Sequence, residues 1–438
     1  MYSAFVTRIK NLRKHSNADR LLCGECFGNT VIVGLDTQPD ELGVYFPVDG
    51  KLGIEFAQKN DLLRRKDENG NPAGGYLDPE KRNIKALKLR GEKSDGLFMP
   101  LSSLAEFTDI SQLKDGDTIT QLNGVTICEK YVPVRKQSAN VGAGNRTRKR
   151  KDPISPQFME HADTEQLPYN LGAFHQGDLV EITLKMHGTS QRTGYLPMLS
   201  GYKRTLLDKL FRRPGTPIYD WGYVTGTRRV VLDTYDGGFY GSNAFREQHA
   251  KMFEGKLHKG ETVYYEVVGF TDDGTPIMAS CDNKKVGDKD FVKQYGKQTV
   301  FSYGCSPDSV DAPKSALYVY RMTMTNEDGD VVEYSPFFMR YRCEQMGVNC
   351  VPLLWSGFVP ENDNPGEWVK GVAECYYDGA DPIGKSHVRE GVVCRIVNRP
   401  KFTAYKHKNF AFKVLEGIVK EVASAPDMEE AQEVTEAA

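Results

Sequence analysis

The stretch EITLKMHGTSQRTGY, residues 181–195, places one lysine where the sequence pattern changes. Residues 181–184 alternate as a strand does, and we expect this strand to end at the apolar Leu184. Lys185 follows at once, and after it comes MHGTS (186–190), a run too small and polar to continue a core strand. Two interpretations are open: Lys185 is a charge at a strand end, or it is a nucleophile held at the mouth of a pocket.

Segments further along the chain have a similar character. Each is mostly a run of strand-forming residues that carries a charged or aromatic side chain. They are TGTRRVVL (225–232), TVYYEVVGF (262–270), ALYVYRMTM (316–324), REGVVCRI (389–396) and KFTAYKHKNFAFKV (401–414). Each charge alone has an ordinary explanation, such as a solvated strand end. Their order along the chain favours one shared site.

In order and content these segments resemble the covalent nucleotidyltransferases, which include the polynucleotide ligases and the mRNA capping enzymes. The first motif of that superfamily, K-x-[D/H]-G, is matched by Lys185, His187 and Gly188. The third motif ends a strand with a glutamate, which corresponds to Glu266. The aromatic residue of the following motif corresponds to Tyr320.

The remaining motifs are matched near the end of the chain. The fourth, E-G-V-V, begins at Glu390, and the final K-x-K corresponds to Lys406 and Lys408. The resemblance implies that both lysines face the α-phosphate of ATP and stabilise the charge that develops there. It also implies that Glu390 holds a divalent metal ion, Mg²⁺ or Mn²⁺, directly or through water.

Two details of the match stay open. The arginine before the third motif is Arg229, with Arg228 beside it, or else Arg204 at the end of the earlier GYKR. His187 stands where many members of the superfamily have aspartate, and a histidine does not supply that carboxylate to a metal-bound water. In this it is similar to the nick-sealing RNA ligases. We expect His187 and Gly188 to lie at the bound nucleotide.

The resemblance implies a defined reaction at Lys185. A lysine amine is a nucleophile only when neutral, and neighbouring positive charges favour the neutral form. Neutral Lys185 would attack the α-phosphorus of ATP, expel pyrophosphate and form lysyl–AMP. Glu266 suits a ribose hydroxyl, and Tyr320 suits stacking on adenine. The planar guanidinium of Arg229 suits hydrogen bonds to ribose or to an RNA 5′-phosphate.

The composition is that of an ordinary globular protein. The chain has 438 residues, 39% of them hydrophobic, and a formal net charge of -2. Affinity for nucleic acid must therefore come from local basic patches. We find neither a signal peptide at the start nor an apolar run long enough for a membrane helix, so we expect a cytoplasmic protein with no membrane partner. We expect the nine cysteines to be free thiols.

The length and the pattern of elements predict two domains. Residues 1–130 read as short strands of a small β-barrel, like an OB fold, and RKHSNADRL resembles a turn of the OB-type tRNA-binding domains. Residues 131–165 form a basic linker, and residues 166–420 form the nucleotidyltransferase domain. The acidic tail, 421–438, is expected to be disordered.

The domain order selects a member of the superfamily. DNA ligases and capping enzymes place an OB domain after the K-x-K strand, where too few residues remain here. The order resembles the ATP-dependent RNA ligases with an N-terminal OB fold and a C-terminal nucleotidyltransferase domain. That resemblance implies an α+β protein with an OB-like barrel and ATP-grasp-like antiparallel sheets with helices. It also implies an enzyme that joins RNA 3′-OH and 5′-phosphate ends, with nicks in a duplex preferred.

Three alternatives remain. An ATP-dependent DNA ligase would fit the same motifs. A non-catalytic RNA-binding protein with a relic nucleotide pocket would keep the fold without the reaction. A tRNA-binding accessory factor would explain only residues 1–130.

Overall fold

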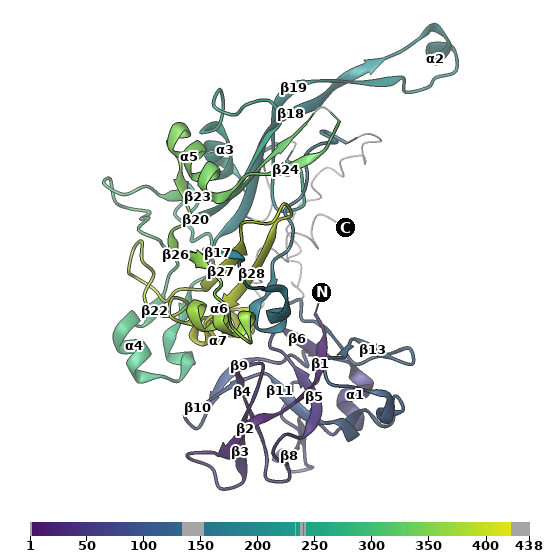
Figure 1. Cartoon of the computed structure of the whole chain (residues 1–438), viewed down its shortest axis with the longest axis vertical. Helices are drawn as coiled ribbons and strands as arrows, with labels where there is room; N and C mark the ends of the chain where they lie inside the picture. The colour runs from purple at the N-terminus through teal and green to yellow at the C-terminus, as the bar shows by residue number, and fades with distance from the viewer. Residues whose placement is uncertain are drawn as a thin grey trace. The chain divides into compact units, whose positions relative to one another are not determined.

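A computed structural model describes residues 2–133 and 153–421, apart from 233, 237–239, 241 and 327. Most of the predicted basic linker, residues 134–152, and the tail from 422 onward lie outside the described residues. The described chain forms two compact units (Figure 1). The first unit contains 2–133, 282–297 and 410–421, and the second contains 153–281 and 298–409. None of the described helices combines the length and apolar character needed to cross a bilayer.

Short strands make up most of the first unit. One sheet has the order β11 (Leu97–Pro100), β5 (Leu42–Phe46), β1 (Ala4–Arg8) and β12 (Thr118–Ile119), and another has the order β2 (Lys10–Lys14), β3 (Leu21–Cys26) and β4 (Asn29–Gly34). Two-stranded pairs are formed by β6 (Gly50–Leu52) with β15 (Cys128–Lys130), β9 (Ala86–Leu89) with β10 (Glu92–Asp95), β13 (Gln121–Leu122) with β14 (Val125–Thr126), and β7 (Arg65–Lys66) with β8 (Pro72–Gly74). The prediction of short strands is confirmed. A closed barrel is not found in the described part of this unit, so the predicted OB barrel is not confirmed.

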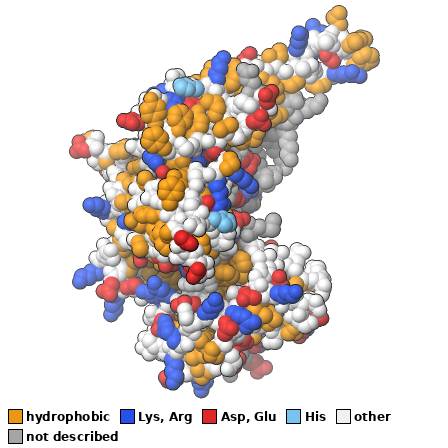
Figure 2. All heavy atoms as spheres, in the orientation of Figure 1, with side chains coloured by type: hydrophobic (Ala, Val, Ile, Leu, Met, Phe, Trp, Pro, Cys, Tyr) orange, Lys and Arg blue, Asp and Glu red, His pale blue; other side chains and the backbone are white. Residues whose placement is uncertain are grey.

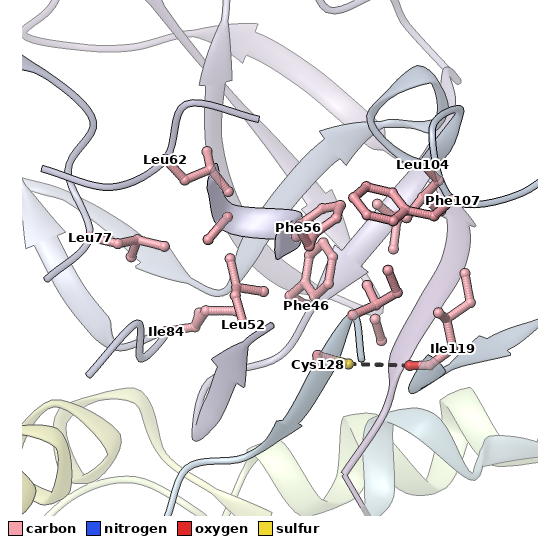
Figure 3. Packing of buried hydrophobic residues seen from close by; sticks show 14 of the residues in the cluster. Phe46, Leu52, Phe56, Leu62, Leu77, Ile84, Leu104, Phe107, Ile119 and Cys128 are labelled. Atoms are coloured by element: carbon pink, nitrogen blue, oxygen red, sulfur yellow. Dashed lines mark hydrogen bonds between the residues drawn. The ribbon is translucent and has the colours of Figure 1, made fainter. Parts of the chain in front are cut away.

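Figure 3 shows a cluster of buried apolar side chains in the first unit. Helix α1 (Ile54–Lys59) contributes Phe56, whose ring packs against Phe46 and Phe107 at centroid distances of 5.3 and 5.8 Å. The Cys128 thiol donates a hydrogen bond to the backbone oxygen of Ile119, 3.2 Å away. Buried aromatic rings supply much of the apolar area that drives folding.

A tight turn joins β3 and β4. The strands pair as Cys26 with Asn29, so Phe27 and Gly28 form the turn, with φ of 53° and 75°. Positive φ at both central residues is the mark of the tight turns whose twist matches a hairpin. Glycine adopts this region without the steric cost that other residues meet.

Two segments from later in the chain belong to the first unit, although the sequence analysis placed them within 166–420. They contain η5 (Asn283–Val286), α4 (Lys289–Tyr295) and α7 (Phe410–Glu421). Helix α7 buries Phe412 and Leu415. Lys413 Nζ lies 2.6 Å from an Asp95 carboxylate oxygen, and Lys88 forms an ion pair with Asp288. Sequence spacing gave no sign of these long-range contacts.

The second unit contains two larger sheets (Figure 1). One has the order β16 (Glu165–Gln166), β28 (Thr403–Lys408), β27 (Gly391–Ile396), β17 (Leu179–Leu184) and β26 (Leu353–Phe358). The other has the order β19 (Thr216–Gly226), β18 (Thr189–Lys203), β20 (Glu261–Gly269), β23 (Ser315–Thr325) and β24 (Val331–Glu333), with β25 (Asn349–Cys350) also beside β23. The strands β21 (Cys281–Asp282) and β22 (Gln298–Thr299) form a separate pair. The predicted mixture of helices with largely antiparallel sheets is therefore present.

Helices cover these sheets. The unit includes α2 (Leu206–Leu210), α3 (Ala244–Lys251), α5 (Pro336–Met346) and α6 (Pro365–Glu374), and the 3₁₀ turns η3 (Leu167–Tyr169) and η4 (Leu171–Ala173). Val369 and Ala373 of α6 belong to one core cluster with Ile182 of β17 and Val392 of β27. This packing holds together β17, which ends one residue before Lys185, and β27, which begins one residue after Glu390.

The loop after Leu184 is shorter than the sequence predicted. Residues 186–188 connect the two sheets, but Thr189 and Ser190 already belong to β18 and are buried. The guanidinium of Arg246, which is fully buried, donates hydrogen bonds to Thr189 Oγ1 (2.6 Å) and to the Ser190 carbonyl (3.1 Å). The expected end of the strand at Leu184 is confirmed. Thr189 and Ser190, which the sequence analysis grouped with the polar run, begin the next strand, where buried hydrogen bonds satisfy these small polar residues.

A buried ion pair fixes the start of β20. Glu261 accepts hydrogen bonds from Arg342 Nε (2.9 Å) and Nη2 (2.8 Å), and from the Tyr334 hydroxyl (3.0 Å). Burial acts to raise the pKa of the Glu261 carboxyl, but the hydrogen bonds from Arg342 and the His258 backbone outweigh it and lower the pKa below its usual value. This pair joins α5 to the strand that carries Glu266.

We predict that Arg342→Ala lowers the free energy of unfolding by about 3–5 kcal/mol, because it leaves the Glu261 carboxylate buried without its partner. Lys251→Ala is the control, since Lys251 forms an exposed ion pair with Glu247 and its loss should leave stability unchanged. Chemical denaturation measures both variants. Equal stabilities of the two would contradict a structural role for the buried pair.

The same pair predicts a dependence on pH. Because the pKa of Glu261 is lowered in the wild type, its contribution is present above the usual carboxyl pKa and is lost as the pH falls below it. In Arg342→Ala the buried carboxyl has a raised pKa, so protonation stabilises the variant as the pH falls. The difference in stability between wild type and variant should therefore narrow on acidification. A constant difference would contradict this explanation.

Candidate active site

A buried carboxylate lies at the centre of the site. Glu390 has a side chain only 2% exposed, and its Oε1 lies 2.7 Å from Lys185 Nζ and 3.5 Å from Lys408 Nζ. Strand pairing brings the three residues together. In the pairing of β17 with β27, Leu184 lies opposite Val392, and the Lys185 amide donates a hydrogen bond to the Gly391 carbonyl at 3.0 Å. In the pairing of β27 with β28, Gly391 lies opposite Lys408. Residues 185, 390 and 408 were predicted from separate motifs, and the structure places them in contact.

Steric constraints explain why the residue after Glu390 is a glycine. Gly391 has φ of 147°, and a Cβ atom there would lie 2.0 Å from the backbone oxygen of His407. Any larger residue would push β27 away from β28, and with it Glu390 away from Lys408. The glycine of the E-G-V-V motif therefore allows the close approach of the two strands.

The charges around Glu390 determine its ionisation. Burial acts to raise the pKa of the Glu390 carboxyl, but the positive charges of Lys185 and Lys408 outweigh it and lower the pKa to about 2. The carboxylate is therefore ionised at neutral pH and balances the lysines. Its second oxygen, Oε2, is buried and faces His187 Nδ1 at 3.6 Å, and it has no shorter hydrogen bond within the described part of the chain.

The Oε2 atom of Glu390 fits a divalent cation. In the described residues there is no cluster of three or more His, Cys, Asp or Glu side chains arranged to hold a metal ion. A magnesium ion, however, is commonly held by one or two carboxylates with substrate phosphates and water as its other ligands. Glu390 Oε2 fits that arrangement, in which a bound nucleotide supplies most of the coordination.

An aromatic pocket positions His187. Its amide donates a hydrogen bond to the Tyr303 hydroxyl at 2.8 Å, and its ring meets Phe301 edge-on at a centroid distance of 4.5 Å. The ring of buried His387 contacts both Phe301 and Tyr303. Burial, together with the negative charge of Glu390, raises the pKa of Tyr303, so its hydroxyl stays protonated. The sequence analysis missed Phe301, Tyr303 and His387, because they lie outside the recognisable motifs.

A second group of residues lies on the adjoining sheet. Ser190 Oγ donates to Glu266 Oε2 at 3.2 Å and lies 3.5 Å from the Tyr320 hydroxyl. The predicted residues Glu266 and Tyr320 are thus brought together by Ser190, which the sequence analysis did not single out. Its position two residues after Gly188 was the available signal, because alternation along a strand fixes which side chains share a face.

Gly188 joins the two groups. A Cβ atom there would lie 2.4 Å from the Val267 carbonyl and 2.9 Å from the Glu266 side chain. The loop that follows Lys185 therefore lies directly against β20. Only glycine allows this approach, which brings Glu266 next to the loop that carries His187.

Lys406 shares β28 with Lys408, two residues earlier, so both side chains leave the same face of the strand. In the register of the sheet Lys406 lies opposite Val393, and Lys408 lies opposite Gly391. Lys406 is partly exposed. Its predicted role at the α-phosphate stays a prediction.

The three candidates for the arginine before the third motif lie in two different parts of the second unit. Arg228 and Arg229 lie in the bend after β19, where both form ion pairs with Asp163. Asp163 is two residues from His161, whose ring meets Tyr320 edge-on at 4.9 Å. Arg204 instead lies near the end of the β18–β19 hairpin and donates to the Pro214 carbonyl at 3.2 Å. The contacts through residues 161–163 favour Arg228 and Arg229 over Arg204.

Gly188→Ala provides a test of this packing. We predict a loss of about 1–3 kcal/mol in the free energy of unfolding, because the added methyl group meets the backbone of β20. Gly172→Ala is the matched control, since a Cβ atom at that position would meet nothing within 4 Å. Thermal and denaturant unfolding measure both. A variant as stable as the control would contradict the close contact between the loop and β20.

Comparison with known proteins adds a structural likeness. Neither a family model nor a curated protein sequence matches the chain. Among solved structures, the Naegleria gruberi RNA ligase with pyrophosphate matches with a TM-score of 0.56 and 17% identity, covering 93% of this chain and 97% of that one. A lysine-to-alanine variant of that ligase with ATP and Mn matches with a TM-score of 0.55 and 16% identity. A lysine-to-methionine variant with AMP and Mn matches with a TM-score of 0.54 and 16% identity. Each match covers 94% of this chain and 97% of the other. The chain therefore has the fold of the Naegleria gruberi RNA ligase along nearly its whole length.

Proposed function

We propose that the protein is an ATP-dependent RNA ligase that joins RNA 3′-OH and 5′-phosphate ends through a lysyl–AMP intermediate. The observation that carries the proposal is the contact of Lys185 and Lys408 with one buried carboxylate, Glu390. The fold shared with a solved RNA ligase supports it, since structures of that ligase contain ATP, AMP with Mn, or pyrophosphate.

Lys185 is the proposed nucleophile. Its ammonium group loses a proton to water, and the neutral amine attacks the α-phosphorus of ATP. A P–N bond forms with loss of a second proton to water, while the bond from that phosphorus to pyrophosphate breaks. Glu390 holds the amine in place at 2.7 Å before the nucleotide arrives. A lysine that is positioned in advance reacts with little further loss of orientational freedom.

Lys408 and Lys406 act on the phosphate. One carboxylate faces both Lys185 and Lys408, so the base of the site has an excess of positive charge that suits an anionic phosphate. As negative charge develops at the α-phosphate in the transition state, the two β28 lysines stabilise it. Mg²⁺ or Mn²⁺, when bound at Glu390 and the phosphates, neutralises phosphate charge and orients the leaving group.

The second group of residues recognises the nucleoside. Glu266 is held by Ser190 and offers carboxylate oxygens to a ribose hydroxyl. Tyr320 stacks on adenine, and Arg229 binds ribose or the RNA 5′-phosphate. His187 and Gly188 line the nucleotide site from the loop that follows Lys185. These roles follow from the motif match and from the contacts described above.

The RNA steps follow adenylylation. AMP passes from Lys185 to the RNA 5′-phosphate, and attack by the 3′-OH then forms the phosphodiester bond and releases AMP. We propose that a nick in a duplex is the substrate, and that residues 1–130 act as an OB-type RNA-binding domain. The short strands and the buried apolar cluster of the first unit support that proposal.

Lys185→Ala should abolish transfer of label from α-labelled ATP to the protein, because the variant lacks the amine that forms the P–N bond. Lys251→Ala, which changes an exposed lysine on α3, should label normally. A denaturing gel after incubation with magnesium measures both. Label that persists on Lys185→Ala would place the nucleophile elsewhere. A wild type that joins DNA 3′-OH ends as fast as RNA ends would favour the DNA ligase alternative.

Glu390→Gln and Lys408→Ala should fail in different ways. Lys408→Ala should raise the adenylylation barrier by about 2–4 kcal/mol, the scale for losing one preorganised electrostatic contact. Glu390→Gln should shift the magnesium dependence to higher concentration, because an amide is a weaker ligand for this hard cation than a carboxylate. Single-turnover adenylylation against magnesium concentration measures both effects. An unchanged magnesium dependence in Glu390→Gln would exclude its metal role.

A further inference from the structure

The hairpin of β18 and β19 extends beyond the sheet to which it belongs (Figure 1). The pairing of β18 with β20 ends at Gly194, but its pairing with β19 continues to Lys203, opposite Thr216. We call residues 195–223 the arm and residues 202–215, which include α2, the arm tip. The nucleotidyl transfer proposed above uses no residue of the arm.

The arm tip has a defined local structure. Thr205 and Asp208 form a reciprocal capping box at the start of α2, and the Arg213 guanidinium lies 5.5 Å from the centre of the Phe211 ring. Gly215 has φ of 90°, and a Cβ atom there would lie 2.6 Å from the Lys203 carbonyl. A tight turn and a cap therefore hold α2 at the end of the ribbon.

Apolar side chains at the arm tip face solvent. Leu206 is 84% exposed and Phe211 is 61% exposed, and Leu207 and Leu210 are also exposed. An ordered group of large apolar side chains without a core beneath it is typical of a binding surface. Figure 2 shows hydrophobic and basic side chains together at the end of the arm.

The charge of the arm tip indicates the kind of partner. It carries five basic residues and one acidic residue, Asp208. The Asp208 carboxylate already accepts hydrogen bonds from the Thr205 backbone and hydroxyl, at 2.9 and 2.6 Å. The basic residues are Lys203, Arg204, Lys209, Arg212 and Arg213, and all are exposed. This excess of positive charge, on a protein of net charge -2, is complementary to a polyanion.

One face of the arm below the tip is aromatic. Tyr195 stacks on Tyr223 at 4.7 Å and lies 5.8 Å from Trp221, and Lys259 lies over the Trp221 ring. These rings are only partly buried. Leu196, on the opposite face, is buried in a cluster with Phe158. Near its base the arm therefore has one buried face and one face of partly exposed aromatic rings, with the positive charge of Lys259 beside them. Aromatic rings next to positive charge are typical of nucleic-acid binding.

We infer that the arm binds RNA, with its basic side chains on phosphates and its apolar tip against the face of an unpaired or terminal base. This inference rests on the proposed function for the choice of RNA. In an A-form duplex the major groove is too narrow for side chains, so an apolar tip meets base faces only where bases are unpaired or at an end. A five-residue helix is short for a membrane-surface helix, and the basic excess disfavours a second copy of the same tip.

Two variants of the full-length chain test the base contact of the apolar tip separately from the phosphate contacts of the basic side chains. In the apolar variant, Leu206, Leu210 and Phe211 are changed to serine; in the charge variant, Arg212 and Arg213 are changed to glutamine. Fluorescence anisotropy without ATP or magnesium measures binding to a labelled nicked RNA duplex with a single-stranded overhang. The apolar variant should bind about tenfold more weakly with an unchanged salt dependence. The charge variant should reduce the slope of log K against log salt by about two.

Matched controls are Val310→Ser, which changes an exposed apolar residue outside the arm, and Lys251→Gln. A blunt, fully paired RNA hairpin should reduce the difference between the apolar variant and the wild type, because it offers fewer base faces. Wild-type binding by both arm variants would overturn the inference. So would a loss, in the apolar variant, of self-association or of binding to anionic vesicles, with RNA binding intact.

Failure of the arm inference can be told apart from failure of the ligase proposal. If the wild type fails to adenylylate Lys185 but the arm variants still bind RNA more weakly, the arm remains an RNA-binding surface and the ligase proposal fails. If adenylylation is intact and the arm variants bind and seal RNA as the wild type does, the ligase proposal stands and the arm inference fails.

Discussion

The site depends on one buried carboxylate that faces two lysines. Glu390 is ionised because Lys185 and Lys408 lie within 3.5 Å of it, and it holds them close together despite their mutual repulsion. A single negative charge does not neutralise two positive ones, so the base of the site suits an incoming phosphate. In the proposed reaction, the same contact holds the amine of Lys185 in place before the nucleotide binds. The contact of Glu390 with the two lysines therefore both stabilises the site and prepares it for the proposed reaction.

Backbone geometry makes that interaction possible. Gly391 lets β27 and β28 approach, and Gly188 lets the loop after Lys185 lie against β20. Arg246 holds the first residues of β18 by buried hydrogen bonds to Thr189 and Ser190. The two sheets of the second unit are therefore joined at the residues where the proposed reaction takes place. A polar connection of this kind is stable only when its buried groups are paired.

The sequence was sufficient to predict most of the strands that carry the motif residues, because alternation and turn residues are local signals. The prediction of a strand over 225–232 was wrong after Gly226, where β19 ends and the bend with Arg228 and Arg229 begins. It also selected residues 185, 390 and 408 from three distant segments, and the structure places them in contact. It did not predict Tyr303 and His387 around His187, or the position of α7 in the first unit. Those contacts depend on tertiary packing, which no local pattern encodes. The early start of β18 was missed for the same reason, since its hydrogen-bond partner Arg246 is far away in the sequence.

The central claim is that Lys185 forms a covalent bond to AMP, and mass spectrometry tests it most directly. The wild-type protein would be incubated with ATP and magnesium, and its intact mass and its AMP-bearing peptide would then be determined. The account predicts the addition of one AMP, located on Lys185 by fragmentation. AMP on any other residue, or no addition under conditions in which the protein binds ATP, would contradict it.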